Sequence, residues 1–178
     1  MKNQKIIFIN IFQRFLNTLN TDNLSQICWN RNNLEPWTAY ASEIFARILQ
    51  DDFKLEAARK GHADKYGRYE YFNIDVIAYD DCCWKPPIIA IEIENYFSRI
   101  EYSAWKLFSV DCRFRLLLTY YYPKANSKYF AKNLADIKKK ISPIADDNKR
   151  KPLLLIYGNG AANPRKQSWD KIFKTYWF

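Results

Sequence analysis

Two short apolar runs that carry acidic residues constrain the fold of this chain more than any other feature. Residues 71–79 read Tyr-Phe-Asn-Ile-Asp-Val-Ile-Ala-Tyr, and residues 88–94 read Ile-Ile-Ala-Ile-Glu-Ile-Glu. Both runs are rich in β-branched and aromatic residues, and turn-forming residues bound them, Asp80-Asp81 after the first and Pro86-Pro87 before the second. These signals predict two paired β-strands.

Alternation along the two strands places the acids together. Side chains of a strand point to opposite faces with a period of two. One predicted face is apolar, and it is made by Phe72, Ile74, Val76, Ala78, Ile89, Ile91 and Ile93. If the apolar faces of the two strands coincide, then Asp75, Glu92 and Glu94 share the opposite face.

Three carboxylates at close range repel one another and resist burial. A divalent cation relieves that repulsion, and Mg²⁺ prefers hard oxygen ligands, commonly one or two carboxylates plus phosphate oxygens of a substrate. A hairpin with one solvated face accounts for the same pattern, because antiparallel sheets often expose one face to water. The pattern therefore indicates either a cation site or an exposed strand pair.

Periodicity predicts the elements on either side of the acidic strands. Residues 36–50 are expected to form a helix with a buried apolar stripe, and Glu43 lies away from the centre of that stripe. Residues 99–110 predict a second helix, in which Lys106 is the only lysine. Residues 114–122 are almost wholly apolar, which is typical of a strand buried on both faces.

The acidic positions and the order of these elements resemble the PD-(D/E)XK nuclease superfamily, also called the restriction-endonuclease-like fold. Asp75 is followed 17 residues later by Glu92-Ile93-Glu94 at the end of an apolar strand. The predicted elements over residues 36–122 fit that family's α-β-β-β-α-β core, an α/β fold with a mixed central sheet flanked by helices. The resemblance implies that Asp75, Glu92 and the backbone carbonyl of Ile93 bind Mg²⁺, with Mn²⁺ as a possible substitute.

The resemblance also assigns roles to residues outside the metal ligands. Glu43 matches the acid of the family's first helix and would contribute at the edge of the site; the alternative is a surface ion pair with Arg47, one turn later. The last motif position is usually lysine, and here it is Glu94, which would bind metal or position the attacking water. In some similar members the lysine has moved to the following helix, where this chain has Lys106.

Charge favours a polyanionic partner. Lysine and arginine number 28 against 19 acids, giving a net charge of +9. Nucleic acid, double-stranded DNA in particular, is the first expectation, and an anionic membrane surface is the second. Cleavage of both strands would call for a homodimer or another partner, and a two-fold dimer would match a palindromic site.

The remaining segments predict one domain over residues 1–178, with additions on both sides of the core. Residues 6–19 predict an amphipathic helix, and no run reaches the roughly twenty apolar residues of a membrane helix. Residues 127–141 predict a basic helix, residues 153–157 a buried strand, and residues 163–178 a short helix capped by Ser168. The aromatic C-terminal residues are expected to dock on the chain's own body or on a second subunit.

Four cysteines without a C-x-x-C pair, and a single histidine, disfavour a zinc site and fit a reducing, cytoplasmic setting. The combined prediction is a Mg²⁺-dependent DNA endonuclease of restriction, defence or repair type. The alternative is a nuclease-like fold that has lost its chemistry and acts as a nucleic-acid-binding or protein-interaction module. Glu94 in place of the motif lysine favours the alternative, whereas intact acids at Asp75 and Glu92 favour the enzyme.

Overall fold

The computed structural model describes residues 2–29, 35–68, 72–80, 85–123, 131–148 and 151–178. Three features of the sequence lie outside these ranges. They are Tyr71 at the start of the first acidic run, the Cys82-Cys83 pair, and residues 127–130 of the predicted basic helix.

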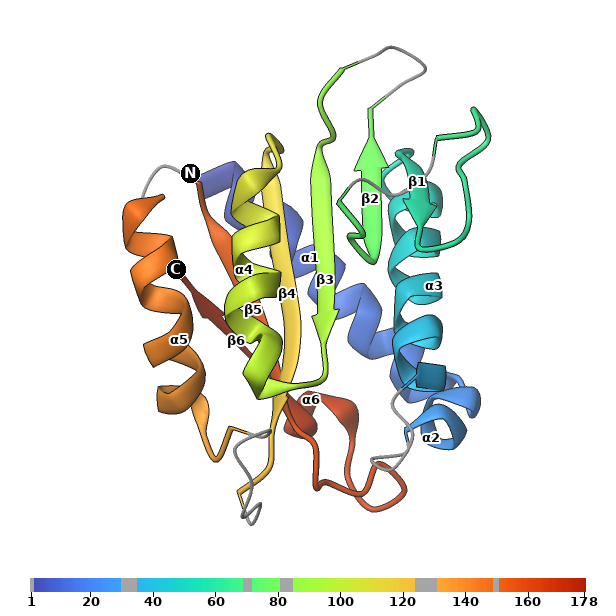
Figure 1. The fold of residues 1–178 in the computed structure, drawn as a ribbon. Helices are drawn as coiled ribbons and strands as arrows, with labels where there is room; N and C mark the ends of the chain where they lie inside the picture. Colours follow the sequence, from blue (N-terminus) through green and yellow to red (C-terminus); the bar gives the residue numbers. More distant parts are fainter. Residues whose placement is uncertain (1, 30–34, 69–71, 81–84, 124–130, 149–150) are drawn as a thin grey trace.

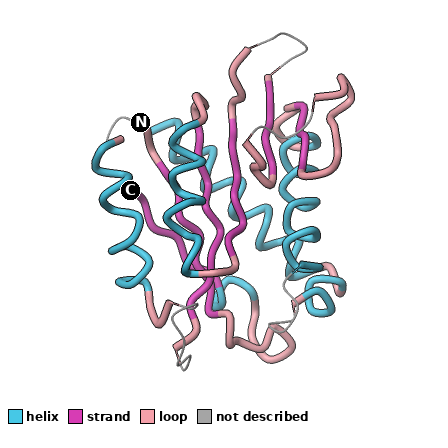
Figure 2. The backbone as a smooth tube through the Cα atoms, in the orientation of Figure 1, coloured by secondary structure: helices cyan, strands magenta, loops and turns pink. Residues whose placement is uncertain are grey.

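In the described residues, three helices are followed by three strands, after which helices and strands alternate to the C-terminal strand (Figures 1 and 2). In chain order the described elements are α1 (Lys2–Thr21), α2 (Leu24–Cys28), α3 (Glu35–Asp51), β1 (Glu56–Arg59), β2 (Val76–Tyr79), β3 (Ile89–Glu94), the 3₁₀ turn η1 (Phe97–Arg99), α4 (Ile100–Ser109), β4 (Phe114–Tyr121), α5 (Leu134–Asp147), β5 (Leu153–Asn159), α6 (Trp169–Ile172) and β6 (Phe173–Trp177).

In the described part of the chain, six strands form one open sheet in the order β1-β2-β3-β4-β5-β6. The first three strands pair antiparallel, β3, β4 and β5 run parallel, and β6 returns antiparallel at the edge. The expectation of an α/β protein with a mixed sheet flanked by helices is therefore confirmed. Each parallel connection passes through a helix, α4 between β3 and β4 and α5 between β4 and β5.

Helices cover both faces of the sheet, and strand alternation sorts the core into two layers. Helices α4 and α5 lie in front of the sheet in Figure 1, while α1 crosses behind it and α3 lies beside β1. Ile89 and Ile91 of β3 pack with the core of α1 and α3, whereas Ala90 between them packs with the core of α4 and α5. This is the period of two expected for a strand buried on both faces.

An aromatic cluster joins the C-terminal segment to the layer behind the sheet. The rings of Trp37 and Trp169 stack with centroids 5.5 Å apart, and Phe173 stacks on Trp169 at 5.8 Å. Trp177 of β6 meets Phe8 of α1 edge-on at 5.1 Å. The terminal rings thus dock on the chain's own body.

Three predicted elements require correction. The first acidic strand begins at Val76, because Phe72 and Asn73 adopt left-handed backbone angles (φ of 57° and 54°) that end any strand there. Residues 173–177 form strand β6 rather than a helix, because hydrogen bonds to the edge of β5 outweigh the helical pattern. Helix α5 begins at Leu134, where the side chain of Asn133 caps the helix by accepting from the Asp136 N–H.

The resemblance implies a third antiparallel strand, but no pattern in the sequence located it. Strand β1, Glu56–Arg59, has only four residues and pairs with β2 at the edge of the sheet. Among the residues that the structure describes, no helix is both long and apolar enough to cross a membrane.

Candidate active site

The three predicted strand acids lie together where β2 begins and β3 ends. Asp75 lies immediately before β2, and Glu92 and Glu94 are among the last three residues of β3. Because β2 and β3 are antiparallel, the beginning of one strand adjoins the end of the other, at the lower end of the sheet in Figure 1. Helix α4 begins just beyond the end of β3 and carries Lys106.

Asp75 is buried and held by the backbone of β3. Its Oδ2 accepts a hydrogen bond of 2.8 Å from the Ile93 N–H, and its own N–H donates to Glu92 Oε1 at 3.3 Å. Burial raises the pKa of Asp75, while the bond from Ile93 and the charges of Lys106 and Lys60 counter that rise. The backbone thus fixes one carboxylate beside the other.

Glu92 and Lys106 form a buried ion pair. The Lys106 ammonium lies 2.7 Å from Glu92 Oε2 and 2.8 Å from Oε1, and it donates a third bond to the Asn73 carbonyl at 3.0 Å. Burial raises the pKa of Glu92 to about 8; the charge of Asp75 adds to the rise and Lys106 opposes it. A lysine predicted to reach the site from the following helix does lie against its central acid.

Asn73 contacts the ion pair through its backbone carbonyl. The left-handed turn at Phe72 and Asn73 directs the Asn73 carbonyl at Lys106. Two successive non-glycine residues with positive φ are uncommon and cost on the order of 1 kcal/mol each. Such strain concentrates at functional sites. Its position beside the Glu92–Lys106 pair therefore favours a functional role for this part of the molecule.

Glu94 lies two residues beyond Glu92 in β3, and both of its carboxylate oxygens accept hydrogen bonds. Oε1 accepts from the Tyr96 N–H at 2.8 Å, and Oε2 accepts from the Ser103 hydroxyl at 2.9 Å. Burial raises the pKa of Glu94, and these two bonds counter the rise. The side chain therefore joins the end of β3 to η1 and α4.

The far end of α4 is anchored by β4. Arg115 is buried, and its guanidinium donates to the carbonyls of Leu107 at 2.8 Å and Val110 at 2.7 Å. These carbonyls lie at the end of the helix, where no intrahelical donor remains. The anchor holds Lys106 at a fixed distance from β3.

A cavity of about 500 Å³ opens over the acids. It is lined by residues from α3, the β1–β2 loop, β3, η1 and α4: Glu35, Thr38, Lys60, Asn73, Asp75, Glu92, Ile93, Glu94, Asn95, Tyr96, Arg99, Tyr102, Ser103 and Lys106. Four carboxylates and three cationic side chains face it. Asn95 donates from its Nδ2 to the Thr38 hydroxyl at 2.7 Å, while its buried Oδ1 has no hydrogen-bond partner among the described residues.

The predicted helix acid is not part of this cavity. Glu43 pairs with Arg59 at 2.6 Å and with Arg47 at 3.9 Å, and it does not line the cavity. The alternative of a surface pair with Arg47 is thus present, alongside a closer pair with Arg59 of β1. Helix α3 turns Glu35, two turns earlier, toward the site instead.

Nine lining residues were not among the predicted site residues: Glu35, Thr38, Lys60, Asn73, Asn95, Tyr96, Arg99, Tyr102 and Ser103. Each reaches the cavity from a helix end or a loop whose path depends on tertiary packing. The turn at Asn73, inside a run read as strand, could not be inferred from residue types that favour strands.

The geometry limits the kind of cation site that is possible. No group of three histidine, cysteine, aspartate or glutamate side chains in the described ranges is arranged to hold a metal ion. Asp75 and Glu92 remain as a pair of adjacent carboxylates, because Glu94 bonds to Tyr96 and Ser103. Two carboxylates, with substrate phosphates and water, match the usual coordination of Mg²⁺.

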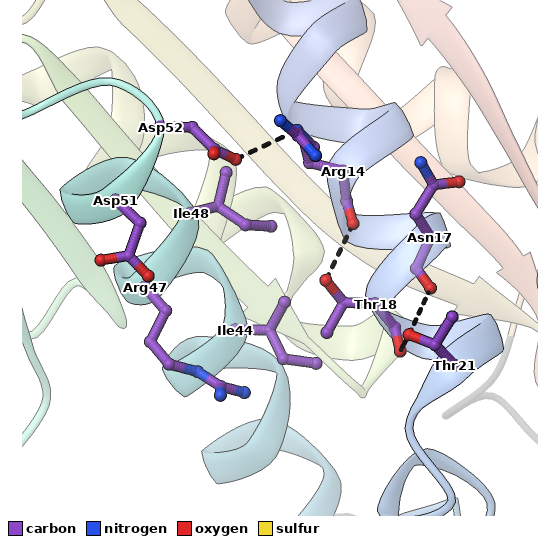
Figure 3. Close-up of a pocket in the computed structure, with 9 residues that line it drawn as sticks. All are labelled: Arg14, Asn17, Thr18, Thr21, Ile44, Arg47, Ile48, Asp51 and Asp52. Carbon is purple, nitrogen blue, oxygen red and sulfur yellow. Dashed lines mark hydrogen bonds and ion pairs between the residues drawn. The ribbon is translucent and has the colours of Figure 1, made fainter.

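A second hollow between α1 and α3 does not have this character (Figure 3). Its volume is about 330 Å³, and Arg14 pairs with Asp52 across it at 3.2 Å. The hydroxyls of Thr18 and Thr21 bond to carbonyls of their own helix, as the dashed lines in Figure 3 show. These polar groups are satisfied by ordinary helix and surface contacts.

In comparisons with known proteins, no family model, no curated protein and no solved structure matches this chain.

Proposed function

We propose that this protein is a metal-dependent nuclease with a restriction-endonuclease-like core. One observation carries the proposal: Asp75, Glu92 and Lys106 converge in a cavity at the end of β3, two buried carboxylates with one buried ammonium. Buried charges are costly unless they are paired or coordinate a cation. A phosphodiester hydrolase needs this combination to hold a metal and a phosphate side by side.

The arrangement of elements supports the same proposal. Residues 35–121 run α3-β1-β2-β3-α4-β4, with three antiparallel strands followed by a parallel one. The resemblance implies the order α-β-β-β-α-β, and the agreement of this segment with it supports the proposal. Asp75 lies immediately before β2, Glu92 and Glu94 lie in β3, and Lys106 lies in α4.

The residues present fit a bound Mg²⁺ or Mn²⁺. Asp75 and Glu92 supply carboxylate oxygens, the Ile93 carbonyl a backbone oxygen, and Asn95 Oδ1 an acceptor for a coordinated water. When bound, the metal would lower the pKa of the attacking water and neutralise charge on the scissile phosphate.

The chain's own residues then have distinct tasks. The Ile93 N–H orients the Asp75 carboxylate, and Lys106 can move from Glu92 to a phosphate oxygen once a cation neutralises the acids. Cations placed at developing phosphoryl charge stabilise the transition state. We assign Glu94 to positioning, since its bonds to Tyr96 and Ser103 hold η1 and α4 against β3.

The charge balance makes substrate binding depend on the cation. Glu35, Asp75, Glu92 and Glu94 face the same space as three cationic side chains. With the acids ionised, the cavity carries a small net negative charge that opposes a phosphate. One divalent cation reverses the sign, so metal and substrate should bind cooperatively.

A cleavage assay tests the proposal. Purified protein is incubated with supercoiled plasmid, single-stranded DNA and RNA, with Mg²⁺, with Mn²⁺ and with a chelator. Asp75→Asn and Glu92→Gln should abolish metal-dependent cleavage, and titration calorimetry should show that each weakens Mn²⁺ binding. Glu43→Gln is the matched control, because it changes one acid that lies outside the cavity. Cleavage by both site variants at the wild-type rate would refute the assignment.

A nucleic-acid-binding module without chemistry is the second candidate. The observation that favours it is the Glu92–Lys106 ion pair, which satisfies the central acid without a metal. Binding of nucleic acid that is unchanged by Mn²⁺ and by a chelator, with no cleavage of any substrate, would favour this module over the enzyme.

A further inference from the structure

Large aromatic side chains gather on the rim of the cavity. Tyr102 is 59% exposed, Trp105 50% and Tyr96 41%. Tyr96 and Tyr102 line the cavity, and Trp105 extends the same surface along α4. A contiguous group of exposed rings of this size is typical of a ligand-binding surface.

The rings form an organised surface. Tyr102 and Trp105 lie three residues apart on α4, so they occupy one face of the helix, and their rings stack with centroids 5.9 Å apart and planes 20° apart. The inner face of α4 is made by other residues, Ile100, Ala104, Leu107 and Phe108. The core therefore does not require the outward rings.

This surface adjoins the proposed chemistry directly. The Lys106 ammonium lies 5.5 Å from the centre of the Tyr102 ring and 2.7 Å from Glu92. On the other side, the Arg99 guanidinium lies 5.6 Å from the centre of the Tyr96 ring. Each of the two cavity-lining rings thus has a cationic side chain beside it.

We propose that this surface stacks unpaired nucleobases, so that the substrate is a single-stranded segment of nucleic acid rather than a continuous duplex. The proposal rests on the nuclease function proposed above. In a duplex the base faces are hidden in the stack, whereas an unpaired strand offers each base to an aromatic ring. Arg99 and Lys60 lie where the backbone phosphates of that strand would pass. Duplex DNA, expected from charge alone, would leave the rings uncovered.

Equilibrium binding in a chelator tests the stacking surface without any chemistry. Fluorescence anisotropy compares a labelled 12-nucleotide DNA strand, the RNA strand of the same sequence, the matched duplex, and a strand with three central abasic sites. The wild type should bind the intact single strand at least about tenfold more tightly than the abasic strand, because stacking contributes about 1–3 kcal/mol per base. The DNA and RNA strands separate the two sources of unpaired bases.

Variants locate the effect. Tyr102→Ala and Trp105→Ala should each weaken single-strand binding about fivefold or more. They should leave duplex binding unchanged. Tyr66→Ala is the matched control, since Tyr66 is 47% exposed and does not line the cavity. Circular dichroism checks that each variant is folded.

The outcomes separate this inference from the nuclease function. Equal binding of intact and abasic strands, or single-strand binding unaffected in both variants, overturns the stacking surface even if Mg²⁺-dependent cleavage is present. Preferential single-strand binding that falls in Tyr102→Ala and Trp105→Ala supports it even if no substrate is cut, in which case the nuclease function alone fails.

Discussion

Replacing Glu92 with glutamine should remove much of the pH dependence of folding stability between pH 5 and 9. In the folded protein, burial and the nearby charge of Asp75 raise the pKa of Glu92 from its ordinary value of 4.5 to about 8. The folded state therefore keeps a proton that the unfolded chain releases. An acid of this kind favours folding below pH 4.5 and loses that contribution as the pH rises toward 8.

The size of the effect follows from the two pKa values. Each pH unit over which the folded state alone holds the proton lowers the free energy of unfolding by about 1.4 kcal/mol. From pH 5 to 9 the wild type should lose about 4 kcal/mol through Glu92, as an upper limit set by full desolvation. Glutamine cannot ionise, so Glu92→Gln lacks this loss. The charge of Lys106 is already included in this pKa, because it opposes the rise that burial causes.

Urea denaturation at pH 5, 6, 7, 8 and 9 in a chelator, followed by tryptophan fluorescence, measures the difference. The change in unfolding free energy between pH 5 and 9 should be about 2–4 kcal/mol smaller in Glu92→Gln than in the wild type. Glu101→Gln is the control, because Glu101 is exposed on α4 and the substitution makes the same change in net charge.

Parallel pH profiles for wild type and Glu92→Gln would refute the reasoning, because they would mean that Glu92 is not desolvated in the fold. A second arm adds Mg²⁺ at pH 8. If the acids bind it, a hundredfold excess over the dissociation constant should stabilise the wild type by about 2.7 kcal/mol and leave Glu92→Gln unchanged.

Three further substitutions test the buried ion pair, the anchor of α4 and the aromatic cluster behind the sheet. Lys106→Met should abolish metal-dependent cleavage and, by leaving Glu92 without its cation, destabilise the fold by about 2–4 kcal/mol at pH 8 and by less at pH 5; equal destabilisation at both values would contradict the buried ion pair. Arg115→Leu should cost about 2–3 kcal/mol in urea denaturation, because the last carbonyls of α4 lose their donors; an unchanged midpoint would show that the anchor is dispensable. Trp169→Ala should cost about 3–5 kcal/mol in thermal or urea unfolding, since the ring is buried in the aromatic cluster behind the sheet; a loss below about 1 kcal/mol would mean that the cluster repacks.

Most of the sheet and its helices could be predicted from the sequence, because their patterns are local. The apolar run ending in Glu92-Ile93-Glu94 became β3, and residues 114–122 became β4 nearly in full. The helical spacing around Glu43 and Lys106 became α3 and α4. These segments bury whole faces, so their periodicity survives into the fold.

The C-terminal segment shows where local pattern fails. Residues 173–177 carry aromatic and basic residues at a spacing that suits a helix, yet they extend the sheet as β6. The edge of β5 offers unpaired backbone groups, and this non-local partner decides the outcome. The residues of 173–177 alone do not indicate that one side of β5 has unpaired backbone groups.

The candidate site divides in the same way. The amino-acid sequence alone determined, through the alternation of each strand, that Asp75, Glu92 and Glu94 share one face if the apolar faces of the two strands coincide, and the pairing of Val76 with Ile91 meets that condition. Only the tertiary structure decided that a left-handed turn brings the Asn73 carbonyl to Lys106, and that α3 presents Glu35 rather than Glu43 to the cavity. Turn angles and helix rotation depend on packing between elements distant in sequence, and that packing is settled only when the whole core forms.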